Sequence, residues 1–161
     1  MGDGIDTDLL APGAYMSGSL DTLSSHCLEA LRPDFASAVR PGDIIVAGAS
    51  LGLGSSREQA AEALKHLGIR AIIASSLGGI FQRNALNLGL PAIACPALNL
   101  DGIEEFTSTD VDIAAGNLTI GGRQFAIEAL PDFLLAMIAD GGMLTHPVSY
   151  THLTLPTIFR V

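Results

Sequence analysis

The chain has 161 residues, of which 48% are hydrophobic and 16% are charged, and its 8 Lys and Arg against 17 Asp and Glu give a net charge of −9. That length is enough for one domain with a buried core. A nucleic-acid binder needs a basic face and a membrane helix needs about 20 uncharged apolar residues, so both classes are excluded.

Charge this sparse indicates that a partner covers part of the surface. Cys27 and Cys95, the two cysteines, lie neither in a CxxC pattern nor at ligand spacing from a histidine. The sequence therefore predicts no metal or cluster site in this chain alone. Two lone thiols favour a location in the reducing cytoplasm. The N-terminus also lacks the basic and then apolar pattern of a signal peptide.

The chain opens with the composition of a loop, with three aspartates in residues 3–8. Because a loop usually follows an element, we expect a strand before Met1 to belong to the fold. The pattern then predicts a helix over residues 21–31 with Asp21 as its N-cap. A short second helix is expected over residues 33–39, with Phe35 as its core anchor.

Apolar runs and helical patterns alternate in the middle of the chain. They predict buried strands at Ile44–Ala47, Ala71–Ala74 and 91–95. Helices are predicted between these strands at 57–67 and 80–88, and a glycine closes each of them. This order is typical of a right-handed parallel βαβαβ core. Sites in such sheets gather at the carboxyl ends of the strands, where the glycine turns at 48–54 and 78–79 both lie.

After Pro96 the pattern changes to short strands at 111–115, 118–120 and 124–127, separated by glycine turns. A last helix is expected to begin with Pro131 at its first position and to end near Ala139. Neither a repeat nor a linker interrupts the chain, so residues 1–146 are predicted to form one domain.

The tail at residues 147–161 does not continue this rhythm. It is rich in threonine, and residues 148–157 look like the translation of a common transposase sequencing adapter. We expect the tail to be non-native, with a natural edge strand as the alternative, and we draw no function from Tyr150 or His152.

The stretch over residues 48–62 carries the strongest functional signal. After the first strand come Gly48, Gly52 and Gly54, then Ser55-Ser56-Arg57 and a helix. Such a turn presents free backbone N–H groups and a positive helix end to an anion. The structural alternative is a capping box between Ser55 and Glu58. The glycines and the arginine inside the box favour the anion site, because a cap needs neither.

Several motifs together resemble the small subunit of 3-isopropylmalate dehydratase, in the aconitase swivel-domain family. They match over residues 2–144 and are, in order, Gly2-Asp3-x-Ile5-Asp6-Thr7-Asp8, Asp34-Phe35-Ala36, Pro41-Gly42-Asp43-Ile44, Gly52-x-Gly54-Ser55-Ser56-Arg57-Glu58 and Ile80-Phe81-x-Arg83-Asn84-Ala85. The resemblance implies an α/β fold, a swivelling β/β/α three-layer domain with a parallel βαβαβ core. It also implies a heterodimer whose large subunit holds a [4Fe–4S] cluster. The expected reaction isomerises 2-isopropylmalate, a small dicarboxylate, by dehydration and rehydration in leucine biosynthesis.

The same resemblance assigns roles to residues. Ser55 becomes the base, and Ser56 and Arg57 bind a substrate carboxylate, for which arginine has the right fork of donors. Thr7 and Asp8 are placed at the rim of the site, and Tyr15, Met16 and Ser17 form the loop that selects the substrate side chain. Arg83, Asn84, His26 and His66 are expected to be structural or at the surface. The alternatives are a solvated Arg57 paired with Glu58 or Glu62, and an Asp8 that caps a turn.

The chain departs from the family's usual pattern near the expected site. Ala14 stands where a basic residue is usual, and the segments 50–53 and 77–79 also differ. The acid therefore stays open, with homoaconitate and an alkyl-malate such as dimethylmalate as alternatives. A non-catalytic anion-binding swivel module is a further alternative. A phosphate-binding βαβ protein fits poorly, because no lysine follows the glycine loop.

Overall fold

The computed structural model describes residues 1–143, so the predicted tail at 147–161 and the end of the predicted domain at 144–146 lie outside the described residues. None of the helices in the described part is long and apolar enough to cross a membrane. The elements are, in chain order, α1 (Thr7–Leu10), the 3-10 turn η1 (Gly13–Tyr15), α2 (Leu20–Ser25), α3 (Phe35–Ala38), β1 (Ile44–Ala47), α4 (Glu58–His66), β2 (Ala71–Ala74), α5 (Gly79–Asn87), β3 (Ala92–Ala94), β4 (Thr109–Asp112), β5 (Asn117–Ile120), β6 (Arg123–Ala126) and α6 (Asp132–Ala139).

A three-stranded parallel sheet in the order β1-β2-β3 forms the centre and confirms the predicted βαβαβ core. Ile45 is paired with Ile72 across β1 and β2, and Ile73 with Ile93 across β2 and β3. All four residues of β2 are buried, as expected for the middle strand of a sheet that is covered on both faces.

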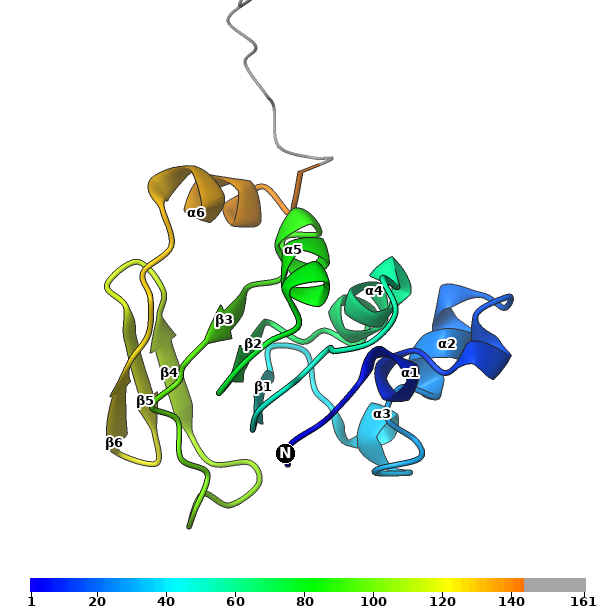
Figure 1. Cartoon of the computed structure of the whole chain (residues 1–161), viewed down its shortest axis with the longest axis horizontal. Helices are drawn as coiled ribbons and strands as arrows, with labels where there is room; N and C mark the ends of the chain where they lie inside the picture. The colour runs from blue at the N-terminus through cyan, green and yellow to red at the C-terminus, as the bar shows by residue number, and fades with distance from the viewer. Residues whose placement is uncertain (144–161) are drawn as a thin grey trace, which may run out of the picture.

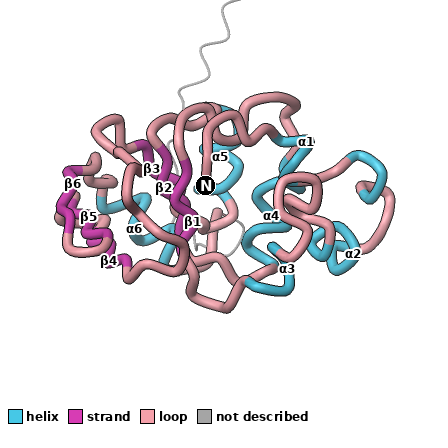
Figure 2. Tube along the Cα trace, turned by 90° about the horizontal axis from the view of Figure 1, so that it is seen from below, coloured by secondary structure: helices cyan, strands magenta, loops and turns pink. Residues whose placement is uncertain are grey.

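The side chains of this sheet alternate between two hydrophobic clusters, because successive residues of a strand point to opposite faces. Ile45, Ile72 and Ala92 belong to the cluster that includes α1, α4 and α5. Ile73 and Ile93 belong to a second cluster with β5. Figures 1 and 2 show the result: α1 to α5 lie on one side of the parallel sheet, and β4, β5 and β6 lie on the other. The predicted β/β/α three-layer arrangement is confirmed.

The second sheet is antiparallel, in the order β4-β5-β6. Its first strand begins at Thr109, two residues before the predicted start at 111. The turns that join its strands contain Gly116 and Gly121, both with positive φ. Pro131 is the N-cap of α6 and not its first helical residue, so that prediction is off by one position.

The predicted helix over residues 21–31 is wrong. Ser19 caps α2, and the helix ends at Ser25. Leu28 has a φ of +58°, a left-handed conformation that a helix cannot contain, and its amide donates to Leu9 O at 2.8 Å. Because Leu28 is fully buried, packing stabilises this turn against the apolar helical pattern of the sequence.

Both cysteine thiols are free and buried. Burial raises the pKa of the Cys27 thiol to about 12. Burial also raises the pKa of Cys95, whose Sγ donates weakly to Ala126 O at 3.6 Å. Both side chains therefore stay protonated near neutral pH and pack as small apolar groups.

Candidate active site

The loop over residues 48–56 leaves the carboxyl end of β1 and is held on one side by the N-terminal segment. Gly52 donates its amide to Ile5 O at 2.7 Å, and Thr7 donates to Leu53 O at 2.9 Å. Segments that lie almost 50 residues apart thus run side by side, and they bring the aspartate-rich opening of the chain to the glycine loop.

The turn after β2 holds the other side of the loop. Leu51 donates to Ser76 O at 3.1 Å, and Gly78 donates to Leu51 O at 2.7 Å. A Cβ at Gly78 would lie 2.4 Å from Gly52 O, so only glycine permits this approach. The two glycine turns predicted at 48–54 and 78–79 therefore meet at one edge of the sheet, as expected.

Ser55 and Ser56 lie exposed immediately before α4. The predicted capping box between Ser55 and Glu58 is wrong, because Arg57 occupies the N-cap position and no side chain caps this helix end. Within residues 1–143 the Ser55 hydroxyl makes no hydrogen bond. The start of α4 therefore keeps uncapped N–H groups beside a serine hydroxyl that no other contact employs.

Arg57 turns back from the start of α4 toward α1. Its Nη1 forms an ion pair with Asp8 and donates to Ala11 O at 3.2 Å, and its side chain is 21% exposed. The alternative partners of Arg57, Glu58 and Glu62, are therefore wrong. Within the described residues only Nη1 of the guanidinium makes hydrogen bonds, so the donors of the Nε–Nη2 edge have no partner there.

The aspartates of the opening segment have separate roles, two of which the loop composition did not reveal. Asp6 caps α1 by accepting from Leu9 N at 2.8 Å, so the alternative in which Asp8 is a turn cap is wrong. Asp3 accepts from Ala49 N at 2.7 Å, and a Cβ at Gly48 would lie 1.8 Å from its Oδ1. Asp3 thus anchors the glycine loop. The only sign of this role in the sequence is that Asp3 stands between Gly2 and Gly4.

The structure places Thr7 beneath the loop and not at an exposed rim. Its side chain is 1% exposed, and its Oγ1 makes no hydrogen bond within residues 1–143. A Cβ at Gly54 would lie 2.7 Å from this oxygen. Thr7 therefore supports the loop from below, while its neighbour Asp8 reaches the surface beside Arg57.

The predicted selectivity loop forms the turn η1. Tyr15 ends this turn, Met16 packs partly against the core, and Ser17 is exposed. The Tyr15 ring stacks on His26, with centroids 3.7 Å apart. His26 therefore contacts this loop, whereas His66 bonds Asp21 at a distance of 2.7 Å between Nε2 and Oδ1.

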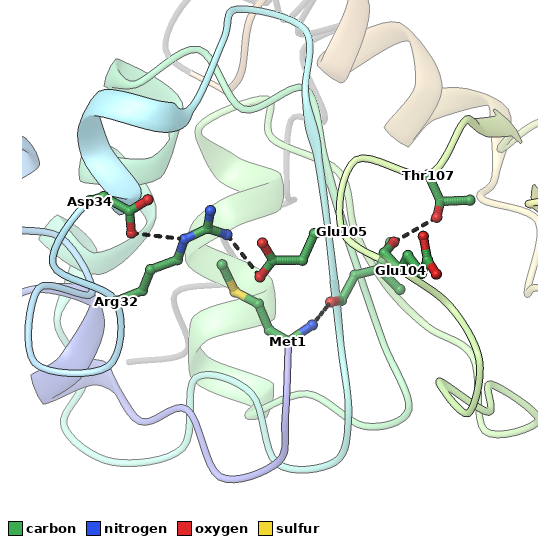
Figure 3. A network of polar contacts seen from close by, with 7 residues as sticks. Met1, Arg32, Asp34, Glu104, Glu105 and Thr107 are labelled. Carbon is green, nitrogen blue, oxygen red and sulfur yellow. Dashed lines mark hydrogen bonds and ion pairs between the residues drawn. The ribbon is translucent and has the colours of Figure 1, made fainter.

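A cavity of about 850 Å³ lies away from the candidate site. It lies along the free edge of β1, between α3 and the segment 100–109, and Figure 3 shows the polar network at its wall. There Arg32 pairs with Asp34 at 3.1 Å and with Glu105 at 2.9 Å. The residues around Ser55, from Leu53 to Ser56, are by contrast exposed.

No group of three His, Cys, Asp or Glu side chains that could hold a metal occurs within residues 1–143. Arg83, which follows the second glycine turn, donates to Gly79 O at 3.2 Å inside α5. The groups that the described residues bring together at the site are two serine hydroxyls, helix-end amides, one arginine and the carboxylate of Asp8.

Comparison with known proteins gives a consistent result. Residues 30–97 match the model of the aconitase C-terminal domain. The chain is 48% identical to the methanogen homoaconitase small subunit of Methanothermobacter thermautotrophicus, over 90% of this chain and 85% of that protein. It is 42% identical to the 3-isopropylmalate dehydratase small subunit of Halothermothrix orenii, over 89% and 88%.

The fold also matches a solved structure. The crystal structure of 3-isopropylmalate dehydratase from Methanocaldococcus jannaschii superposes with a TM-score of 0.80 at 36% sequence identity, over 91% of this chain and 87% of that one. Both the sequence and the arrangement of layers are therefore shared over most of each chain.

Proposed function

The chain belongs to the family of 3-isopropylmalate dehydratase and homoaconitase small subunits, and we propose that it converts 2-isopropylmalate to 3-isopropylmalate together with a large subunit. The observation that carries the proposal is the juxtaposition at the start of α4 of an exposed Ser55 and an Arg57 whose Nε and Nη2 make no hydrogen bond within the described residues. We assign the function to residues 1–146 and none to residues 147–161.

Isomerisation by dehydration needs removal of a proton next to a carboxylate, and the negative charge that develops must be stabilised. Ser55 is the proposed base. Its hydroxyl stands at the positive end of α4, where uncapped N–H groups favour an oxyanion. The guanidinium of Arg57 adds a positive charge, which Asp8 offsets in part, and this cation further favours the serine oxyanion.

The substrate carboxylate is proposed to bind between Ser56 and the Nε–Nη2 edge of Arg57. Asp8 and Ala11 O hold the opposite side of the guanidinium, which fixes its plane. A fixed arginine loses little side-chain entropy when it binds a carboxylate through two parallel hydrogen bonds. In this proposal Asp8 orients the clamp from the rim.

The large subunit is proposed to complete the site and to carry the [4Fe–4S] cluster. When bound, the cluster would supply a Lewis acid for the hydroxyl that leaves and returns. The open surface around Ser55 and the exposed apolar side chains of Leu53 and Ile80 beside it support a partner at this edge. We place the assembly in the cytoplasm, which suits the free thiols of Cys27 and Cys95.

Homoaconitate is the second candidate substrate. The observation that favours it is the 48% identity to a homoaconitase small subunit, which exceeds the 42% identity to the dehydratase relative. The two acids differ in the group that lies beside the reacting carbons, so the turn that carries Tyr15 and Met16 would decide between them.

The test uses this chain with a large subunit of the same family, after reconstitution of the cluster. We expect kcat/KM for 2-isopropylmalate to exceed that for homoaconitate by about tenfold or more, the usual scale for discrimination through a side-chain pocket. A preference for homoaconitate would favour the second candidate. Turnover of neither acid by the assembled pair would contradict both.

A further inference from the structure

A short stretch of chain joins the turn η1 to the proposed carboxylate clamp. Its approach begins at Ala11, whose carbonyl oxygen accepts from Arg57 Nη1 at 3.2 Å. Tyr15 follows four residues later, so its Cα lies within about 14 Å of that of Ala11 even in a fully extended chain. The coiled turn at Gly13–Tyr15 shortens the distance further. The turn η1 and the clamp are therefore tethered to each other through Ala11.

An aromatic stack and a short hydrogen bond hold this turn in place. The rings of Tyr15 and His26 are stacked at 3.7 Å with an angle of 5° between their planes. His26 Nδ1 lies 2.5 Å from Glu29 Oε2. Burial and the charge of Glu29 raise the pKa of Tyr15, so its ring packs as a neutral phenol. The imidazole thus links the turn to Glu29.

The backbone that presents His26 and Glu29 is itself fixed. Between them, Cys27 and Leu28 are buried, and Leu28 N donates to Leu9 O at 2.8 Å. Leu9 belongs to α1, the helix that also carries Asp8. The support of the Tyr15 turn and the support of the Arg57 clamp are therefore parts of one packed unit.

We propose that His26 and Glu29 are positioning residues for substrate selection, and this rests on the function proposed above. They hold the ring of Tyr15, and through it the backbone of Met16 and Ser17, in one orientation beside the carboxylate clamp. A turn that is ordered before binding need not be ordered by the substrate, so the stack lowers KM for the acid whose side chain fits.

A purely structural role does not explain the pair well. The side chains of His26 and Glu29 are 34% and 36% exposed, and an ion pair at such a position contributes little to stability. The chain offers a matched control in His66, which makes a similar bond to Asp21 at 2.7 Å and is 41% exposed. His66 stacks on no aromatic ring in the described part of the chain.

The test compares kcat and KM for 2-isopropylmalate and homoaconitate in reconstituted heteromers. For His26→Ala we expect the ratio of the two kcat/KM values to fall about tenfold, through KM and with little change in kcat. His26→Phe keeps a ring for Tyr15 to stack on and should restore most of the ratio. Glu29→Gln should lower the ratio to an intermediate extent, and His66→Ala should leave it unchanged.

An unchanged ratio in both His26→Ala and Glu29→Gln would overturn the proposal. An equal loss of kcat for both acids together with lower stability would also overturn it, because that result indicates a structural role. If His26→Ala does not fold, the ratio of the two kcat/KM values in Glu29→Gln alone tests the proposal. Failure of the wild-type heteromer to turn over either acid would instead contradict the proposed function.

Discussion

Replacing Ser55 with alanine is expected to lower kcat of the assembled enzyme by about 10³-fold or more, as the loss of a base that acts in the transition state does. Ser55 is exposed and its hydroxyl makes no hydrogen bond within residues 1–143. The substitution should therefore leave the free energy of unfolding and the assembly with the large subunit unchanged. Steady-state turnover and gel filtration of the complex measure the two effects separately.

Ser37→Ala is the matched control for this experiment. Ser37 is also exposed, and its hydroxyl donates to Asp34 O at 2.9 Å beside the large cavity and away from the glycine loop. It should not change turnover. Dehydratase activity unchanged in the Ser55→Ala complex would contradict the assignment of the base and would favour a non-catalytic anion-binding module.

Gly52→Ala is expected to destabilise the domain by about 2–5 kcal/mol, which combines the strain of a left-handed residue with overpacking against an aromatic ring. Gly52 has a φ of +73°, and a Cβ there would lie 2.3 Å from Cγ of Phe81. Phe81 is 1% exposed and cannot move aside. Urea denaturation of the isolated chain measures the loss.

Gly102→Ala separates the two contributions. Gly102 has the same φ of +73°, but a Cβ added there would have no atom within 4 Å. The substitution should cost only about 1–2 kcal/mol, which is the strain of the backbone conformation alone. Equal losses for the two variants would show that the ring of Phe81 does not confine the loop.

The parallel core could be predicted from the sequence because its signals are local. The runs at Ile44–Ala47 and Ala71–Ala74 are short, apolar and bounded by turn residues. The helices between the strands are each followed, directly after the C-cap residue, by a glycine with positive φ, Gly68 after α4 and Gly89 after α5. Where each helix or strand is bounded by its own turn residues, hydrophobic periodicity is sufficient to predict its type and approximate bounds.

The errors arise where distant segments decide the local structure. Ser55 and Glu58 have the spacing of a capping box, but Arg57 is drawn to Asp8, 49 positions earlier in the chain, and the helix begins at Glu58. Leu28, in the predicted continuation of α2, is left-handed, and its amide bonds Leu9 O instead of a carbonyl of a helix. Neither contact can be predicted from the residues that are its neighbours in the chain.

The candidate site was only partly predictable for the same reason. The motif places Ser55, Ser56 and Arg57 together, since they are neighbours in the chain. Whether Thr7 is exposed or buried depends on how the opening segment packs on the loop, and the structure buries it. The stack of Tyr15 on His26 joins two segments whose contact no spacing indicates.

The most direct test of the central claim is to measure dehydration of 2-isopropylmalate by a cluster-loaded large subunit as this chain is added. If the chain supplies half of the active site, the large subunit alone is inactive, and activity rises with the added chain until it saturates. Activity that the chain does not change, or no activity at saturating amounts of a complex shown to assemble, would contradict the claim.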